Sequence, residues 1–415
     1  MKIFIYIILL LLPTYLLRFQ VFHIPTTLLE ILIYTTFLFW LAQSLKNKDL
    51  FSRIAKIFKI MQPFLWPIAL FFASALVALI ISPDKILSLG VLKGWFFDPL
   101  LFLILFLDLI QTKKQIKKVI FSLLISAFLI CLYGLVEYFG KFGLDTDNRL
   151  NSIYLPANFV ALYIVPIVFL GLPALFKQKK YIGLIILLVI LLALYFTHSY
   201  GGWIGLITGI LYLIYKTRKL TINFFDFKAG LKKSTKKLLY LISILFFIVI
   251  IFFEAQNPKF QRIFDWQTRS AVSTRLEIWQ TSLLIIDRFP FGTGLGNFET
   301  IYQETVPEIK FPPLEWLVNK AHNLYLNLWI EMGGMGLVAF LWLIYVFFKK
   351  STNKKEIFLN LCLNSAMLSI LAHGLVDTPY FKNDLSVLFW VIIGIKMIKS
   401  YEIKPVAISC KQILA

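Results

Sequence analysis

Long apolar runs, separated by short polar segments, recur along most of this chain of 415 residues. Each run is roughly 16 to 25 residues long, which is enough for a helix to cross the hydrocarbon core of a bilayer. A transmembrane barrel would instead show short segments in which apolar and polar residues alternate. With 59% hydrophobic and only 15% charged residues, the composition also excludes an ordinary soluble domain. The sequence therefore predicts an all-α fold, a polytopic transmembrane helical bundle.

The usual length criterion predicts about 12 spans. They lie near residues 3–17, 27–43, 64–82, 90–110, 118–138, 156–175, 181–197, 201–215, 238–254, 323–348, 356–376 and 384–398. The first run has no small-residue cleavage site, so we expect it to be retained as the first helix.

Lysine and arginine residues gather in alternate connecting segments, as the positive-inside rule requires of cytoplasmic loops. This rule explains the formal charge of +20 without nucleic-acid binding. The alternation predicts cytoplasmic N- and C-termini. It also predicts three parts: an N-terminal transmembrane bundle (1–254, about nine spans), a large extracytoplasmic loop with an amphipathic helix (255–322), and C-terminal transmembrane helices with a cytoplasmic tail (323–415).

The large loop contains the segment STRLEIWQTSLLIIDRF, which predicts a helix starting at Thr274. Thr274 and Glu277 have the spacing of a capping box, in which each side chain satisfies a backbone donor of the first turn. An apolar stripe at helical spacing would then form the buried face. Its members are Leu276, Trp279, Leu283 and Ile286. Pro290 is expected to end the helix, before the glycine-rich turn GTGLG.

The stretch FTHSYGGWIGL interrupts two apolar runs and predicts a tight outer turn. Gly201 and Gly202 would permit the sharp bend, and Trp203 suits a membrane interface.

Polar residues away from the predicted cytoplasmic face concentrate at one depth, which suggests a cavity at membrane level. Arginine suits phosphate oxygens, and histidine can take a proton from a hydroxyl near neutral pH. Cations and histidines there would suit an anionic lipid-linked substrate, although interfacial arginines can also simply contact lipid phosphates. The alternative is a zinc site of His198, His322 and His373, but no pair has H-x-x-x-H spacing, so we expect no metal.

Four local motifs resemble the O-antigen ligase and polymerase family of membrane glycosyltransferases. They are THSYGGWIGL, STRLEIWQTSLLIIDRFPFGTGLGNF, AHNLYLNLWIEMGGMGL and HGLVDTPYFKNDLSVLFW. The second resembles the family's Arg-x-x-x-Trp helix, and the third its His-Asn-x-x-Leu start of the span after the large loop. The matches extend over roughly residues 145 to 390, and the middle two are the most specific.

The resemblance implies transfer of a glycan from an undecaprenyl-diphosphate carrier to a hydroxyl of a glycan, lipid or protein acceptor. The reaction would take place on the outer face of the cytoplasmic membrane, without metal or other cofactor. The motif match implies that His322 is the base that activates the acceptor and that Arg275 binds the diphosphate.

The sequence departs from the family at Tyr200, where the family usually has arginine. A tyrosine can donate a hydrogen bond to phosphate but brings no charge. Arg149, Arg269 and His198 are candidate replacements for that cation, and Lys320, beside His322, is a further candidate for substrate binding. The alternative function is a transporter or flippase of lipid-linked oligosaccharide, although such proteins tend to carry internal repeats and midplane charges, which are few here.

Overall fold

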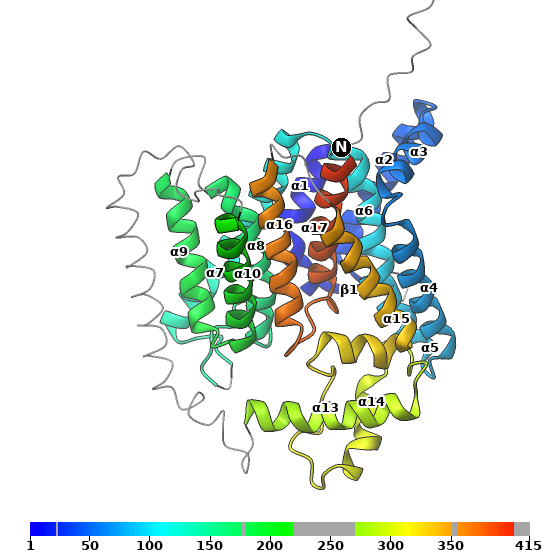
Figure 1. Cartoon of the computed structure of the whole chain (residues 1–415), viewed down its shortest axis with the longest axis vertical. Coiled ribbons are helices and arrows are strands. Elements are labelled where there is room, and N and C mark those ends of the chain that lie inside the picture. Colours follow the sequence, from blue (N-terminus) through cyan, green and yellow to red (C-terminus); the bar gives the residue numbers. More distant parts are fainter. Residues whose placement is uncertain (22–23, 146, 176–179, 220–269, 351–355, 402–415) are drawn as a thin grey trace, which may run out of the picture.

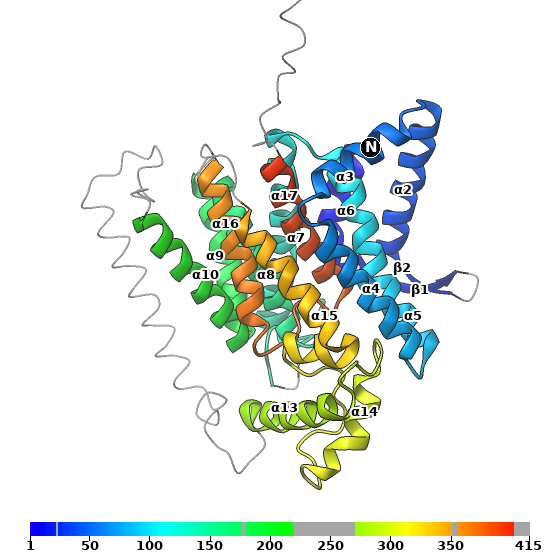
Figure 2. The ribbon, with the colours of Figure 1, turned by 45° about the vertical axis from the view of Figure 1, so that its right-hand side comes forward.

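The computed structural model describes residues 1–21, 24–145, 147–175, 180–219, 270–350 and 356–401. Its main part is a bundle of roughly upright helices, and α13 and α14 lie across one end of this bundle (Figures 1 and 2). The N-terminus lies at the opposite end. The elements up to the first long gap are α1 (Lys2–Leu10), η1 (Leu12–Leu16), β1 (Arg18–Val21), β2 (Ile24–Thr27), α2 (Leu28–Lys46), α3 (Leu50–Met61), α4 (Leu65–Ile81), α5 (Lys85–Leu92), η2 (Lys93–Phe97), α6 (Asp98–Leu109), α7 (Lys113–Gly140), α8 (Asn158–Leu175), α9 (Lys180–Phe196) and α10 (Tyr200–Lys219).

The remaining elements are α13 (Ala271–Arg288), α14 (Phe298–Thr305), η4 (Val306–Glu308), α15 (Leu324–Lys349), α16 (Ile357–His373) and α17 (Asn383–Tyr401). η2 is a π-helical turn that joins α5 to α6, and β1 pairs with β2 as a short antiparallel hairpin. The described residues are thus mostly helical, as the sequence predicts.

The structure supports the predicted number of spans only in part. Among the described residues, four helical segments are long and apolar enough to cross a membrane, namely α2, the continuous stretch from α5 to α6, α7 and α15. The pair α3 and α4, bent by 97°, would make a fifth. Helices occupy the other predicted positions, but several are shorter, and the run 238–254 lies outside the described residues. The first run is not one helix, because α1 ends at Leu10 and a 3-10 turn containing Pro13 follows.

The described residues form two hydrophobic cores. The larger one fills the bundle and includes Leu324 and Leu328 of α15. The smaller one joins α13 and α14 to the segment before α15. Its buried residues are Ile278, Ile285, Phe298, Tyr302, Val306, Val318, Ala321 and Ile330. We call residues 270–323, whose apolar side chains build most of this second core, the α13–α14 unit.

Helix α15 is broken at Gly333, where φ is 69° and ψ is 178°. A side chain there is excluded, because a Cβ atom would lie 2.5 Å from the carbonyl oxygen of Phe291. The turn after α13 also binds α15 just before the break, through hydrogen bonds from Thr293 N to Ile330 O (2.7 Å) and from Trp329 Nε1 to Pro290 O (3.2 Å). The α13–α14 unit is therefore fixed to the bundle at the interruption of α15.

The start of α13 differs from the prediction. The helix begins one turn earlier, and its capping box is formed by Ser270 and Ser273, with Ser273 N donating to Ser270 Oγ at 3.1 Å. Glu277 is buried and instead accepts a hydrogen bond from Leu314 N at 2.8 Å. The predicted capping pair of Thr274 and Glu277 was therefore wrong, whereas the end of the helix before Pro290 is confirmed.

The predicted apolar stripe of α13 was also wrong in part. Ile278, Thr281 and Ile285 are buried, while Leu283 is 59% exposed. Trp279 and Ile286 do pack against the second core, although they are only partly buried. The buried face is rotated from the prediction because α13 packs on both α14 and α15, so polar Thr281 becomes an interior residue.

Candidate active site

The loop between α16 and α17 brings a buried carboxylate, Asp377, to the end of the bundle that faces α13. Its Oδ1 lies 3.6 Å from His322 Nδ1, an ion-pair distance when the imidazole is protonated. Its Oδ2 accepts a hydrogen bond from Asn158 Nδ2 at 3.2 Å. Asp377 therefore connects the start of α8 with the segment before α15.

The backbone around His322 explains why its imidazole faces Asp377. His322 has φ of 45°, in the left-handed region, and the next residue, Asn323, is the N-cap of α15. The Asn323 side chain accepts from Tyr325 N (2.9 Å) and Leu326 N (3.0 Å) and donates to Leu375 O (3.0 Å). The cap satisfies donors of the first turn, and its link to Leu375 holds His322 beside the loop that carries Asp377.

Arg275 reaches the same loop from α13. Its Nε donates to Val376 O at 3.0 Å, and its Nη1 donates to Ala271 O at 3.1 Å. Neither bond uses Nη2, and no described carboxylate pairs with this guanidinium. Arg275 is therefore held next to Asp377 with donor capacity to spare.

Electrostatics couple these groups. Burial alone would raise the pKa of the Asp377 carboxyl, but His322, His373 and Arg275 together hold it well below its usual range. Burial lowers the pKa of the Arg275 guanidinium, and although Asp377 opposes this, the nearby charge of Arg149 adds to it. Asp377 is therefore ionised at neutral pH and stabilises positive charge on the groups around it.

The first motif packs onto the same place, but not as a glycine turn. The positive φ of the turn between α9 and α10 belongs to His198 (45°), whereas Gly201 and Gly202 lie in the first turn of α10. A Cβ atom on Gly201 would lie 2.6 and 2.7 Å from ring atoms of buried His373. The glycine therefore allows α10 to approach α16 closely. Trp203 is only 9% exposed, so it belongs to the core.

We expect Gly201→Ala to lower stability by about 1–3 kcal/mol, because the added methyl group overpacks the His373 ring and Val376. The measurement is the melting temperature of the purified protein. Gly90→Ala is the matched control, since nothing lies within 4 Å of that added Cβ atom. An unchanged melting temperature for Gly201→Ala would contradict the close approach of the two helices.

Arg149 lies near enough to Arg275 for their charges to interact. Its Nε pairs with Asp145 (2.8 Å) and lies 3.5 Å from Asp147. Leu150 N donates to Phe196 O at 2.9 Å, which ties this segment to the end of α9. Of the three candidate replacements for the missing cation, Arg149 is the one whose position beside Arg275 the structure describes, since Arg269 lies outside the described residues.

Lys320 belongs to a separate group. Its Nζ lies 2.6 Å from an oxygen of fully buried Glu331 and 4.4 Å from the centre of the Trp95 ring. Asn327 also donates to Glu331, at 3.1 Å. The charge of Lys320 is therefore balanced by Glu331, although Lys320 lies only two residues from His322.

The remaining predicted residues lie on the turn between α9 and α10. Tyr200 is the first residue of α10, next to Gly201, and the His198 ring lies 5.7 Å from that of Tyr195. In the described part of the chain, no three His, Cys, Asp or Glu side chains form a group that could hold a metal ion. The alternative of a three-histidine zinc site therefore has no supporting geometry there.

The sequence analysis gave the segment HGLVDTPYFKNDL no role in glycan transfer, and only His373 was considered there, as a zinc ligand. This segment supplies His373, which packs on the first motif, and Asp377, which faces His322. The available signal was the density of ionisable residues between two apolar runs.

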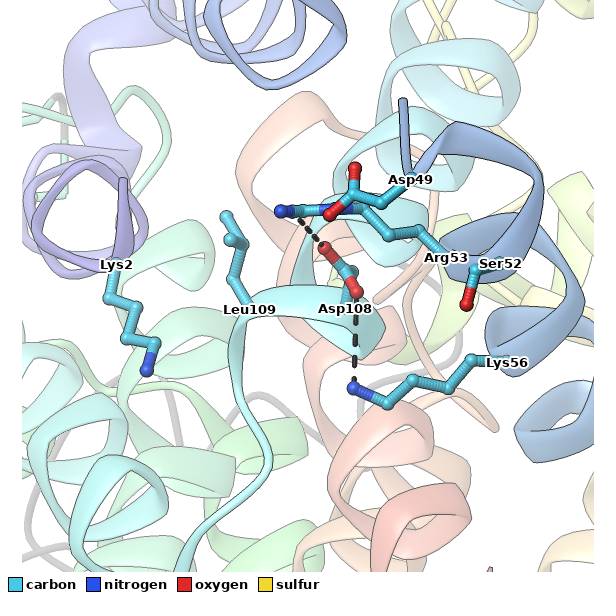
Figure 3. Close-up of a pocket in the computed structure, with 7 residues that line it drawn as sticks. All are labelled: Lys2, Asp49, Ser52, Arg53, Lys56, Asp108 and Leu109. Atoms are coloured by element: carbon cyan, nitrogen blue, oxygen red, sulfur yellow. Dashed lines mark hydrogen bonds and ion pairs between the residues drawn. The ribbon is translucent and has the colours of Figure 1, made fainter. Parts of the chain in front are cut away.

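A pocket of about 330 Å³ lies elsewhere, between the start of α1, the start of α3 and the end of α6 (Figure 3). Its two carboxylates pair with two of its cations, since Arg53 lies 2.8 Å from Asp49 and Asp108 lies 3.0 Å from Arg53 and 3.9 Å from Lys56. None of the predicted site residues lines it.

Part of the chain is similar to a known protein family. Residues 184–341 match the family model described as O-antigen ligase. An uncharacterized protein of Haemophilus influenzae is 23% identical over 257 residues, which are 58% of this chain and 62% of that protein. The chain thus spans less than two thirds of the length of this curated relative. The family match confirms the resemblance to the O-antigen ligase family for the first three motifs, which all lie within residues 184–341 of this integral membrane protein.

Proposed function

We propose that this protein transfers a glycan from an undecaprenyl-diphosphate carrier to an acceptor hydroxyl, as a ligase or polymerase of the O-antigen type. The family match indicates a membrane glycosyltransferase of this class. The observation that carries the proposal is the meeting of His322, Asp377 and Arg275, which come from three separate motifs.

His322 is the proposed general base. Because Nδ1 faces Asp377, the other ring nitrogen, Nε2, is the one assigned to the acceptor hydroxyl. The His322 side chain is 38% exposed, so an acceptor can reach it. Asp377 orients the ring and stabilises the imidazolium that forms when the proton arrives, as a carboxylate does in other base-activated sites.

Arg275 is the proposed ligand of the leaving diphosphate. Its backbone partners fix the guanidinium, and no described residue accepts a hydrogen bond from Nη2, which we assign to phosphate oxygens. The acceptor oxygen forms a bond to the anomeric carbon, while the bond from that carbon to the diphosphate oxygen breaks. The electron pair leaves with the diphosphate, where Arg275 stabilises the growing negative charge, and the hydroxyl proton ends on His322.

The proposed location is the outer face of the cytoplasmic membrane. In this proposal the chain crosses the bilayer about 12 times, with both termini in the cytoplasm and residues 255–322 outside. The distribution of lysine and arginine supports this orientation. The donor would arrive from the membrane and the acceptor from the extracytoplasmic side.

The test is product analysis with the purified full-length protein in vesicles, supplied with an undecaprenyl-diphosphate glycan and a candidate acceptor. We expect a new glycosidic linkage and free undecaprenyl diphosphate in equal amounts. A capped acceptor would identify a ligase, and a lengthened glycan a polymerase. Movement of the glycan lipid across the bilayer with no change of linkage would contradict the proposal and favour a flippase.

A further inference from the structure

Lys382, in the loop just before α17, is a cation that forms no ion pair with any described residue. Its Nζ lies 3.2 Å from the centre of the Phe159 ring, 4.9 Å from that of Tyr154 and 5.3 Å from that of Tyr15. No carboxylate lies within ion-pair distance of this ammonium group in the described ranges. The nearest acidic residue in sequence, Asp384, is instead satisfied by hydrogen bonds from Tyr154 Oη (2.8 Å) and Leu385 N (2.9 Å).

The position is unfavourable for a positive charge in the absence of a ligand. Lys382 O accepts the hydrogen bond of Ser386 N, so the lysine stands at the start of α17. The partial positive charge of a helix N-terminus repels a cation there. The aromatic faces compensate for part of this cost, but an aromatic ring stabilises an ammonium charge less than an anion does. An anion bound at this position would satisfy the charge of the ammonium group.

The same lysine lies beside the candidate active site. Phe159, whose ring it contacts, follows Asn158, and the Asn158 amide donates to Asp377. The charge of Asp377 acts on Lys382, as do those of Asp384 and of Arg18 on β1. The ammonium group thus lies on the bundle side of the site, and Arg275 lies on the α13 side.

We infer that Lys382 binds the phosphate oxygens of the lipid-linked donor and supplies the positive charge that Tyr200 does not. This inference rests on the proposed function, because it names a further ligand of the same diphosphate. Lys382 then provides a cation from the loop after α16. The family usually has an arginine at the position of Tyr200, which is the first residue of α10 here. The electrostatic requirement of the leaving group is met from a different element.

The pH dependence follows from the surroundings of the ammonium group. Burial lowers the pKa of Lys382 to about 8, with Arg18 adding to the effect and Asp384 and Asp377 opposing it. The charge that binds phosphate is therefore present below pH 8 and is lost as the pH rises through that value. The rings of Tyr154 and Tyr15 also face the ammonium group. We expect kcat/KM for the donor to fall above pH 8 in the wild type and to stay level in Lys382→Arg.

The main experiment compares Lys382→Met with the wild type in two assays on the purified full-length protein. Methionine keeps an apolar stem against Phe159, so the fold should persist. We expect the KM for donor to rise about 10- to 100-fold, since a charge-assisted hydrogen bond is lost. The melting temperature without ligand should stay the same or increase, because an unpaired charge is removed. If Lys382 had a purely structural role, its replacement would lower the melting temperature.

Binding is measured separately from turnover by the thermal shift that undecaprenyl diphosphate alone produces. We expect a clear shift for the wild type and a much smaller one for Lys382→Met. Lys396→Met is the matched control: this lysine lies on α17, the helix that follows Lys382, but it already donates to Asn364 at 3.1 Å. A parallel series with phosphatidylglycerol tests for lipid headgroups in general, and an equal lysine-dependent shift there would overturn the assignment to the donor.

The outcomes separate the inference from the proposed function. If the wild type transfers glycan and Lys382→Met shows the same donor KM, pH profile and thermal shift, only the role of Lys382 is wrong. If the wild type neither transfers glycan nor responds to undecaprenyl diphosphate, the proposed function is wrong, and this inference with it.

Discussion

Replacing His322 should reduce the rate of glycan transfer by about 10²- to 10⁴-fold, the usual contribution of a general base. The loss should appear mainly in kcat, because the imidazole acts on the acceptor proton rather than on the donor. His322→Ala removes the imidazole, but it also places alanine at a φ of 45°. His322→Asn is therefore the better variant, since asparagine tolerates the left-handed region.

The measurement is the initial rate of transfer in purified membranes at saturating donor. Both variants should retain the donor-induced thermal shift of the wild type, because Arg275 and Lys382 remain in place. Transfer at the wild-type rate by either variant would show that His322 is not the base. An equal loss of donor binding and turnover would instead assign the histidine to the diphosphate.

Replacing Arg275 by alanine should lower kcat/KM for the donor by about 10²- to 10³-fold, as removal of one preorganised charge-stabilising donor does at other sites. Arg275→Lys should recover only part of this loss, because a lysine cannot keep the bonds to Val376 O and Ala271 O while also presenting a planar pair of donors to phosphate.

Arg288→Ala is the matched control for this series. Arg288 lies at the other end of α13 and pairs with Glu308 on the surface, with side chains that are 41% and 47% exposed. Such an exposed pair contributes about 0–1 kcal/mol, so turnover should stay near the wild-type value. If Arg275→Ala has the kinetics of Arg288→Ala, the proposed role of Arg275 in diphosphate binding is excluded.

The sequence predicted the features that depend on local pattern. Length and hydropathy gave the helices of the bundle, and Pro290 gave the end of α13. The predicted capping pair of α13 was wrong because two neighbouring pairs satisfy the same rule. Ser270 with Ser273 and Thr274 with Glu277 share the spacing of a capping box, and only the packing of Glu277 against Leu314 N decides between them.

The parts of the site that the sequence did not predict are contacts between distant residues. Arg275 and Val376 are 101 positions apart, and Asn158 and Asp377 are 219 apart. Hydrophobic periodicity and short motif spacings do not predict contacts between residues so far apart in the sequence. The roles of His322 and Arg275 came from the family resemblance, and they remain predictions. Gly201 was misread because a glycine required for close helix packing has the same signature as one required for a turn.

The two hydrophobic cores divide the candidate site between them. Arg275 and His322 belong to the α13–α14 unit, whereas Asp377 and Lys382 belong to loops of the bundle. The site thus resembles a subunit interface within one chain, and it is complete only in molecules whose two halves are docked. If the contacts joining the two halves were broken, the apparent affinity for donor would be the intrinsic affinity multiplied by the docked fraction. Gly333→Ala would press against Phe291 O at this junction and would weaken donor binding by lowering the docked fraction.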